Sequence, residues 1–158
     1  MPHINYCLPI YGTGKGVSRL GTYMKWGIRV CNNLKYNSHT NKYFQYYKIL
    51  KFEDQFTLQI LLLGYKFITG SLTSNYYNSD LTFHEEKNRR KNIFDKIMPN
   101  HKTKNTIFET LPAVWNSRTP VIEKSLKIFK AKFKERCFTS YSKITCTKKK
   151  CYSCGTMN

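Results

Sequence analysis

Apolar side chains recur at helical spacing in three long segments of the chain. From Val17 to Cys31 they fall every three or four residues, which traces one face of a helix. The segment from Phe52 to Ile68 is apolar nearly all round, as in a buried central helix. From Ile122 to Cys137 the same spacing returns beneath a face rich in lysine and arginine. The pattern therefore predicts three principal helices.

Two details extend this prediction. In the first helix, Tyr23, Trp26 and Val30 form a second apolar side, so we expect that helix to pack against more than one neighbour. In the third, Thr119 can act as the N-cap with Pro120 at the first helical position, where a missing N–H costs nothing.

The remaining segments carry weaker patterns. A shorter helix is predicted from Asn41 to Leu50, and Gly70 with the turn residues after it should end the central helix. The stretches "NIFDKIM" and "NTIFETL" alternate apolar and polar residues and could pair as two short strands. The sequence thus predicts a mainly α fold, a small helical domain that leaves room for one short β-pair near residues 93–111.

Charge narrows the class of partner. The chain has 158 residues with 27 Lys and Arg against 9 Asp and Glu, a net charge of +18, yet 41% of its residues are hydrophobic, which argues against a disordered basic tail. Nucleic acid relieves the self-repulsion of such a chain, so RNA or DNA is the expected partner and an anionic membrane surface the alternative. The longest apolar run, Leu58 to Ile68, is shorter than the ~18 residues of a membrane span, and no membrane partner is expected. The candidate phosphate contacts, chosen by charge alone, are Lys25, Arg29, Arg89, Arg90, Lys130, Lys134, Lys148 and Lys149.

Six cysteines occur with no secretory signal before them, which predicts reduced thiols in an intracellular, nuclear or cytoplasmic protein that is not secreted. Cys146, Cys151 and Cys154 have metal-ligand spacing but lack a fourth ligand, which Cys137 or His101 could supply. The same tail also resembles the first half of a zinc knuckle. We interpret the three thiols as a chance cluster near a chain end, with zinc as the alternative and no other cofactor expected.

Sequence motifs for catalysis are not found. The stretch "YGTGKG" fits neither the P-loop spacing nor the dinucleotide-binding fingerprint, and it is interpreted as a turn. No Asp-Asp pair is present to hold two metal ions, and the four histidines are scattered. No catalytic residue is assigned.

Four segments carry a further pattern when they are taken in chain order. They are "INYCLPIYG", "RLGTYMKWGIRVCNNLKYNSHT", "YYKILKFEDQFTLQILLLGYKFITGSL" and "LPAVWNSRTPVIEKSLKIFKAKFKERCF". Together they resemble the C-terminal, post-palm region of non-LTR (LINE-type, jockey-like) retrotransposon reverse transcriptases. The residues that carry the last match are Trp115, Asn116, Ser117, Ser125, Leu126, Phe129 and Lys130.

The resemblance implies a helical region over residues 4–138, followed by a basic, cysteine-containing tail over residues 139–158. It implies a truncated fragment of a mobile-element RNA-directed DNA polymerase, because the family's catalytic Tyr/Phe-Ala-Asp-Asp motif is not in this sequence. We expect an inactive fragment with residual, non-sequence-specific binding of RNA or DNA. The alternative is a structural remnant that packs against the missing thumb and palm domains, and a third hypothesis is a small zinc-dependent nucleic-acid module in the tail.

Overall fold

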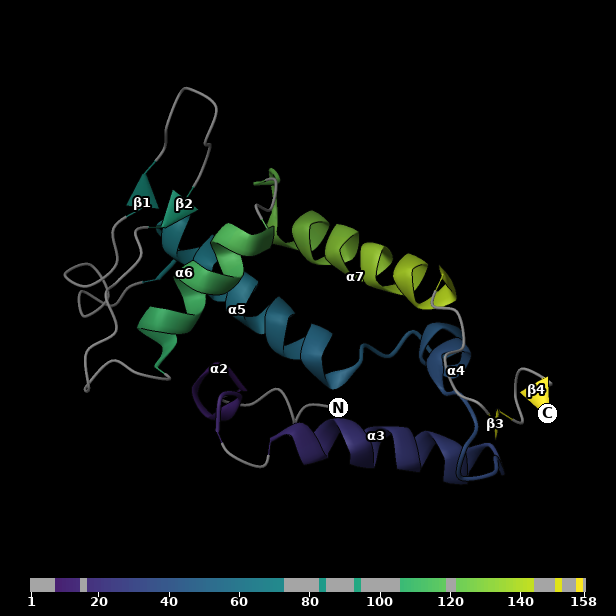
Figure 1. Ribbon diagram of the computed structural model, residues 1–158. Coiled ribbons are helices and arrows are strands. Elements are labelled where there is room, and N and C mark those ends of the chain that lie inside the picture. Colours follow the sequence, from purple (N-terminus) through teal and green to yellow (C-terminus); the bar gives the residue numbers. More distant parts are fainter. Residues whose placement is uncertain are drawn as a thin grey trace. The chain divides into compact units, whose positions relative to one another are not determined.

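Helices make up most of the part of the chain that the structure describes (Figure 1). The computed structural model describes residues 8–14, 17–72, 83–84, 93–94, 106–118, 122–143, 150–151 and 156–157. The helices are α2 (Leu8–Tyr11), α3 (Ser18–Cys31), α4 (Asn41–Tyr46), α5 (Phe52–Ile68), α6 (Ile107–Arg118) and α7 (Leu126–Lys143). The strands are β1 (Phe83–His84), β2 (Ile93–Phe94), β3 (Lys150–Cys151) and β4 (Thr156–Met157). The predicted mainly α class is confirmed.

The chain divides into two compact units, each built from two stretches of sequence. The first unit comprises Met1–Gly14 and Phe56–Lys130, and the second comprises Lys15–Gln55 and Ala131–Asn158.

The core of the first unit is built around Trp115 of α6, which is fully buried. Its ring stacks on Phe129 with 6.5 Å between ring centroids, and Phe129 in turn meets Tyr65 of α5 at 5.1 Å. The Tyr65 hydroxyl donates a hydrogen bond to the Glu123 carbonyl oxygen at 2.8 Å. These contacts join α5, α6 and the start of α7 through aromatic rings.

The first glycines form the predicted turn. After α2, the N–H of Gly12 donates to the Leu8 carbonyl and that of Gly14 to the Tyr11 carbonyl. A Cβ at Gly12 would lie 2.3 Å from the Phe56 ring, so only glycine fits this close approach. Lys15 and Gly16 lie outside the described residues.

The predicted β-pair is wrong in its partner. Strand β2 is one of the expected strands, but it pairs antiparallel with β1, Phe83 opposite Phe94. The other expected strand, in "NTIFETL", is the beginning of α6. Ile107, Leu111 and Trp115 recur at steps of four, which is helical spacing that continues past the interior Pro112.

The second unit has a core of apolar side chains from α4, the start of α5 and α7. Phe44, Leu50, Phe52, Cys137 and Tyr141 are buried there. The rings of Phe44 and Tyr141 meet edge to face with 6.5 Å between centroids. Helix α4 is shorter than predicted, since it ends at Tyr46 and is followed by Lys48 in a left-handed conformation, φ +52°.

Helix ends agree with the sequence in some places and differ in others. The predicted ranges of α3 and α5 are confirmed, and Gly70 follows α5 with φ +66°, as expected of a terminating glycine. Helix α7 begins at Leu126, later than predicted, and the Ser125 hydroxyl oxygen accepts the Ile128 N–H at 3.3 Å. Ser125 therefore caps α7, and the predicted cap at Thr119 and Pro120 falls outside the described residues.

Within the described ranges, no helix combines the length and apolar character needed to cross a membrane.

Candidate nucleic-acid interface

Helix α7 carries a strong excess of positive charge. Its sequence, LKIFKAKFKERCFTSYSK, contains six lysines and arginines and one glutamate. One side of the helix is buried, and its buried residues, at steps of eight and four, are Phe129, Cys137 and Tyr141. Most of the cations of α7 are exposed to solvent, namely Lys127, Lys130, Lys132 and Arg136.

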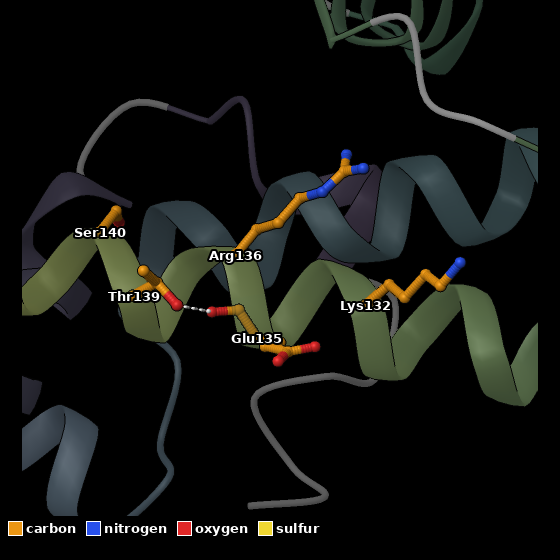
Figure 2. Close-up of a pocket in the computed structure, with 5 residues that line it drawn as sticks. All are labelled: Lys132, Glu135, Arg136, Thr139 and Ser140. Carbon is orange, nitrogen blue, oxygen red and sulfur yellow. Dashed lines mark hydrogen bonds between the residues drawn. The ribbon is translucent and has the colours of Figure 1, made fainter.

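Two of these cations line a shallow hollow on α7 (Figure 2). The hollow is formed by Lys132, Glu135, Arg136, Thr139 and Ser140. Lys132 and Arg136 are four residues apart, so they lie one turn from each other, and Figure 2 shows both extending from the same side of the helix. The carboxylate of Glu135 extends from another side.

The hydroxyl groups in this hollow are already used as donors. The Thr139 hydroxyl donates to the Glu135 carbonyl at 2.9 Å, and the Ser140 hydroxyl donates to the Cys137 carbonyl at 2.7 Å. An anion at this place would therefore receive its hydrogen bonds from the ammonium and guanidinium groups of Lys132 and Arg136. A phosphate oxygen is the ligand that such a pair of cations suits.

The two candidate cations on α3 are less accessible. Lys25 and Arg29 are both half-buried, and Arg29 Nε donates to the Ser38 carbonyl at 3.1 Å. The Arg29 guanidinium also lies 5.9 Å from the centre of the Tyr36 ring. Arg29 thus stabilises the loop after α3 through its hydrogen bond to Ser38.

A polar network at the start of α5 explains how the second unit fixes α7. The Lys51 backbone N–H donates to the Tyr141 hydroxyl oxygen at 3.0 Å, and that hydroxyl donates to Asp54 Oδ2 at 2.5 Å. In an ordinary capping box the third residue of a helix accepts directly from the residue before the helix. Here the tyrosine of α7 stands between the two, so it caps a helix 87 residues away.

Burial shifts the pKa of two groups in this network. It raises the pKa of the Tyr141 hydroxyl well above its ordinary value of 10, and the hydrogen bond to Asp54 raises it further. It lowers the pKa of the Lys51 ammonium, which lies 4.3 Å from the Tyr141 ring centre; nearby Asp54 opposes this shift and Lys25 adds to it. Tyr141 is therefore a neutral hydrogen-bonding group at physiological pH, with a structural part to play.

The other predicted site residues fall into three groups. Lys130 is exposed on α7, whereas Lys134 is half-buried there. Trp115 and Phe129 are buried in the first unit, Leu126 and Asn116 are half-buried, and the hydroxyl of exposed Ser117 donates to the Val114 carbonyl at 2.9 Å. The residues outside the described ranges are Arg89, Arg90, His101, Cys146, Lys148, Lys149 and Cys154.

Of the three thiols in the predicted cluster, only Cys151 lies in the described ranges. Cys151 lies in β3, which pairs antiparallel with β4, and Cys137 is buried in α7. Among the described side chains, no group of three His, Cys, Asp or Glu could hold a metal ion.

The sequence prediction missed two features of the surface. Neither Lys132 nor Arg136 is among the candidate cations, although their spacing of four places the two on one side of a helix. The second apolar side predicted for α3 is exposed, since Tyr23, Trp26 and Val30 are each more than half exposed. The prediction that this side packs against a second neighbour is therefore wrong for the part of the chain that the structure describes.

Comparisons with protein-family models, with curated proteins and with solved structures found no match to this chain.

Proposed function

We propose that this chain binds RNA or DNA without sequence specificity and without catalysis, through exposed cations on α7. The observation that carries the proposal is the pair formed by Lys132 and Arg136, which lie one turn apart and extend from one side of the helix. Exposed Lys127 and Lys130 on the same helix add to the positive potential. We further propose, on the sequence resemblance alone, that the chain derives from the C-terminal region of a non-LTR reverse transcriptase. Such a protein would act in the nucleus or cytoplasm, where its ligand is.

Salt dependence tests this proposal. Binding of the full chain to labelled single-stranded RNA and to duplex DNA should weaken linearly on a log-log plot as salt rises, because each phosphate contact releases counterions. Lys132→Ala and Arg136→Ala should each weaken binding to every sequence and reduce the slope by about one unit.

Two control variants sharpen the test. Glu135→Gln removes the negative charge beside the pair and should strengthen binding, since Glu135 repels a phosphate at the hollow. Lys66→Ala removes an exposed lysine from the last turn of α5, outside the proposed surface, and should leave the slope unchanged. If the salt slopes of Lys132→Ala and Arg136→Ala both equal that of the wild type, the assignment of this surface is refuted.

The alternative of a remnant that only packs against missing domains depended on α5 being uncovered. In the structure Leu58, Ile60, Leu61 and Tyr65 of α5 are buried, and the exposed large apolar side chains of the described region lie on other elements. This favours the binding proposal over the alternative.

A further inference from the structure

Helix α3 presents to solvent a stripe formed by the aromatic side chains of Tyr23 and Trp26 and the aliphatic side chain of Val30, which we call the aromatic stripe. Their side chains are 60%, 58% and 60% exposed, respectively. Steps of three and four residues place all three on one side of the helix. Arg19, one turn before Tyr23, is exposed on the same side.

The opposite side of α3 is the one that packs. Gly21 is buried, and a Cβ built there would lie 3.1 Å from Glu53 Oε1 and 3.7 Å from Phe52 Cβ, at the start of α5. The helix therefore approaches α5 closely through a glycine. Its aromatic stripe is left without a partner from the described part of the second unit.

More exposed aromatic rings lie at the C-terminal end of α3. Tyr36 and Tyr46 are 80% and 78% exposed, and the Tyr46 and Tyr47 rings meet edge to face at 5.1 Å. The Tyr47 hydroxyl donates to Asn32 Oδ1 at 2.7 Å, and Asn32 is the C-cap of α3. This hydrogen bond holds Tyr47, the C-cap of α4, and with it Tyr46 beside the end of the helix that carries the aromatic stripe.

Charge indicates which partner would cover these rings. The first acidic residue of the whole chain is Glu53, so α3, α4 and the loop between them contain no Asp or Glu. Over the same stretch Arg19, Lys25, Arg29, Lys35 and Lys42 supply positive charge. An anionic partner is therefore favoured, and among anions the one that also offers flat apolar faces is a nucleic acid with unpaired bases. A duplex keeps those faces stacked inside and cannot offer them.

We propose that the aromatic stripe of α3 is a stacking platform for the bases of single-stranded RNA or DNA. The inference rests on the proposed function and adds a preference to it: α7 contacts phosphates of any nucleic acid, whereas the aromatic stripe adds affinity for unpaired strands alone. Trp26 is the central residue of the platform, with Tyr23 one turn before it and Val30 one turn after it.

The test compares Trp26→Ala with the wild-type full chain, using a labelled uridylate homopolymer and a duplex of the same length. Base stacking on one aromatic side chain is lost in the variant, so its Kd for the single strand should rise roughly 5- to 150-fold. Its Kd for the duplex and its salt slope should not change, because no phosphate contact is removed. An abasic strand should bind the variant and the wild type equally.

Tryptophan fluorescence gives a second, independent readout. The chain has two tryptophans, and the other one, Trp115, is fully buried in the first unit. The homopolymer should therefore quench the emission of wild-type protein, and it should leave the emission of Trp26→Phe unchanged. Ile10→Ala is the control, because it removes a 73% exposed apolar side chain from α2, outside both the aromatic stripe and α7, and should not alter binding.

The outcomes separate the two proposals. If Trp26→Ala binds the single strand as tightly as the wild type while Lys132→Ala weakens it, the stacking platform is refuted and the phosphate surface stands. If no nucleic acid binds, both are refuted. If the wild type is a dimer in sedimentation and Trp26→Ala is a monomer, the platform is refuted because a second copy of the chain covers the aromatic stripe.

Discussion

Removing a single hydroxyl group at Tyr141 should destabilise the second unit. In Tyr141→Phe the Lys51 N–H loses its acceptor and the Asp54 carboxylate loses its donor. A hydrogen bond to a charged group contributes about 1.5–3 kcal/mol and a neutral one about 0.5–1.5 kcal/mol. Asp54 is only half-buried, so water can replace part of what it loses. We therefore expect the free energy of unfolding to fall by about 2 kcal/mol, the lower end of the range that the two hydrogen bonds give together.

Urea denaturation followed by circular dichroism measures this loss directly. Tyr47→Phe is the matched control, since it removes a hydroxyl of the same kind whose bond to Asn32 is exposed to solvent, and it should cost less than about 1 kcal/mol. A Tyr141→Phe variant that is no less stable than Tyr47→Phe would show that the Tyr141 bridge does not stabilise the start of α5.

The difference in stability between the wild type and Tyr141→Phe should depend on pH. Because the pKa of Tyr141 is raised above 10 in the folded chain, its contribution is complete below pH 10 and is lost as the pH rises further. The difference in unfolding free energy between the wild type and Tyr141→Phe should therefore shrink above pH 10. A difference that stays constant from pH 8 to pH 11 would contradict the shifted pKa.

Two further predictions concern the glycine turn and the basic helix. Gly12→Ala should destabilise the first unit by about 1–3 kcal/mol, because the new methyl group meets the Phe56 ring and the Leu8 carbonyl, whereas Gly27→Ala in α3 meets nothing within 4 Å and should stabilise by about 0.5–1 kcal/mol. Thermal melts of the two variants check both signs, and a Gly12→Ala protein as stable as the wild type would refute the close approach. Lys130→Ala should reduce the salt slope of nucleic-acid binding by about one unit, and an unchanged slope would remove Lys130 from the phosphate surface.

The helices with unbroken apolar patterns could be predicted from the sequence. Helix α5 matches its predicted range from Phe52 to Ile68 because its burial depends on a local run of apolar residues. Helix α6 could not be identified in the same way, since Pro112 interrupts a short segment whose first residues also alternate like a strand. Its identity depends on Trp115, which is buried by a stacking partner from α7.

The candidate site shows the same division. That α7 is basic could be read from the sequence, but which of its cations are accessible depends on how Phe129, Cys137 and Tyr141 orient the helix. The exposure of Trp26 could not be predicted, because an aromatic residue at helical spacing is usually part of a core. The link between Tyr141 and Asp54 spans 87 residues and leaves no local pattern.

The hydrogen bond between Tyr141 and Asp54 also has a consequence for synthesis on the ribosome. The stretch Lys15–Gln55 emerges well before Ala131–Asn158, with which it forms one unit. At about 5–20 residues per second, Tyr141 would follow Asp54 after roughly 4–17 s, since they are 87 residues apart. During that interval Phe44 lacks the ring of Tyr141 and Asp54 lacks its hydroxyl, so the nascent chain presents apolar surface that the finished unit buries. The second unit can complete its core only after α7 has left the exit tunnel, and in this period the nascent chain is most exposed to aggregation and chaperone binding.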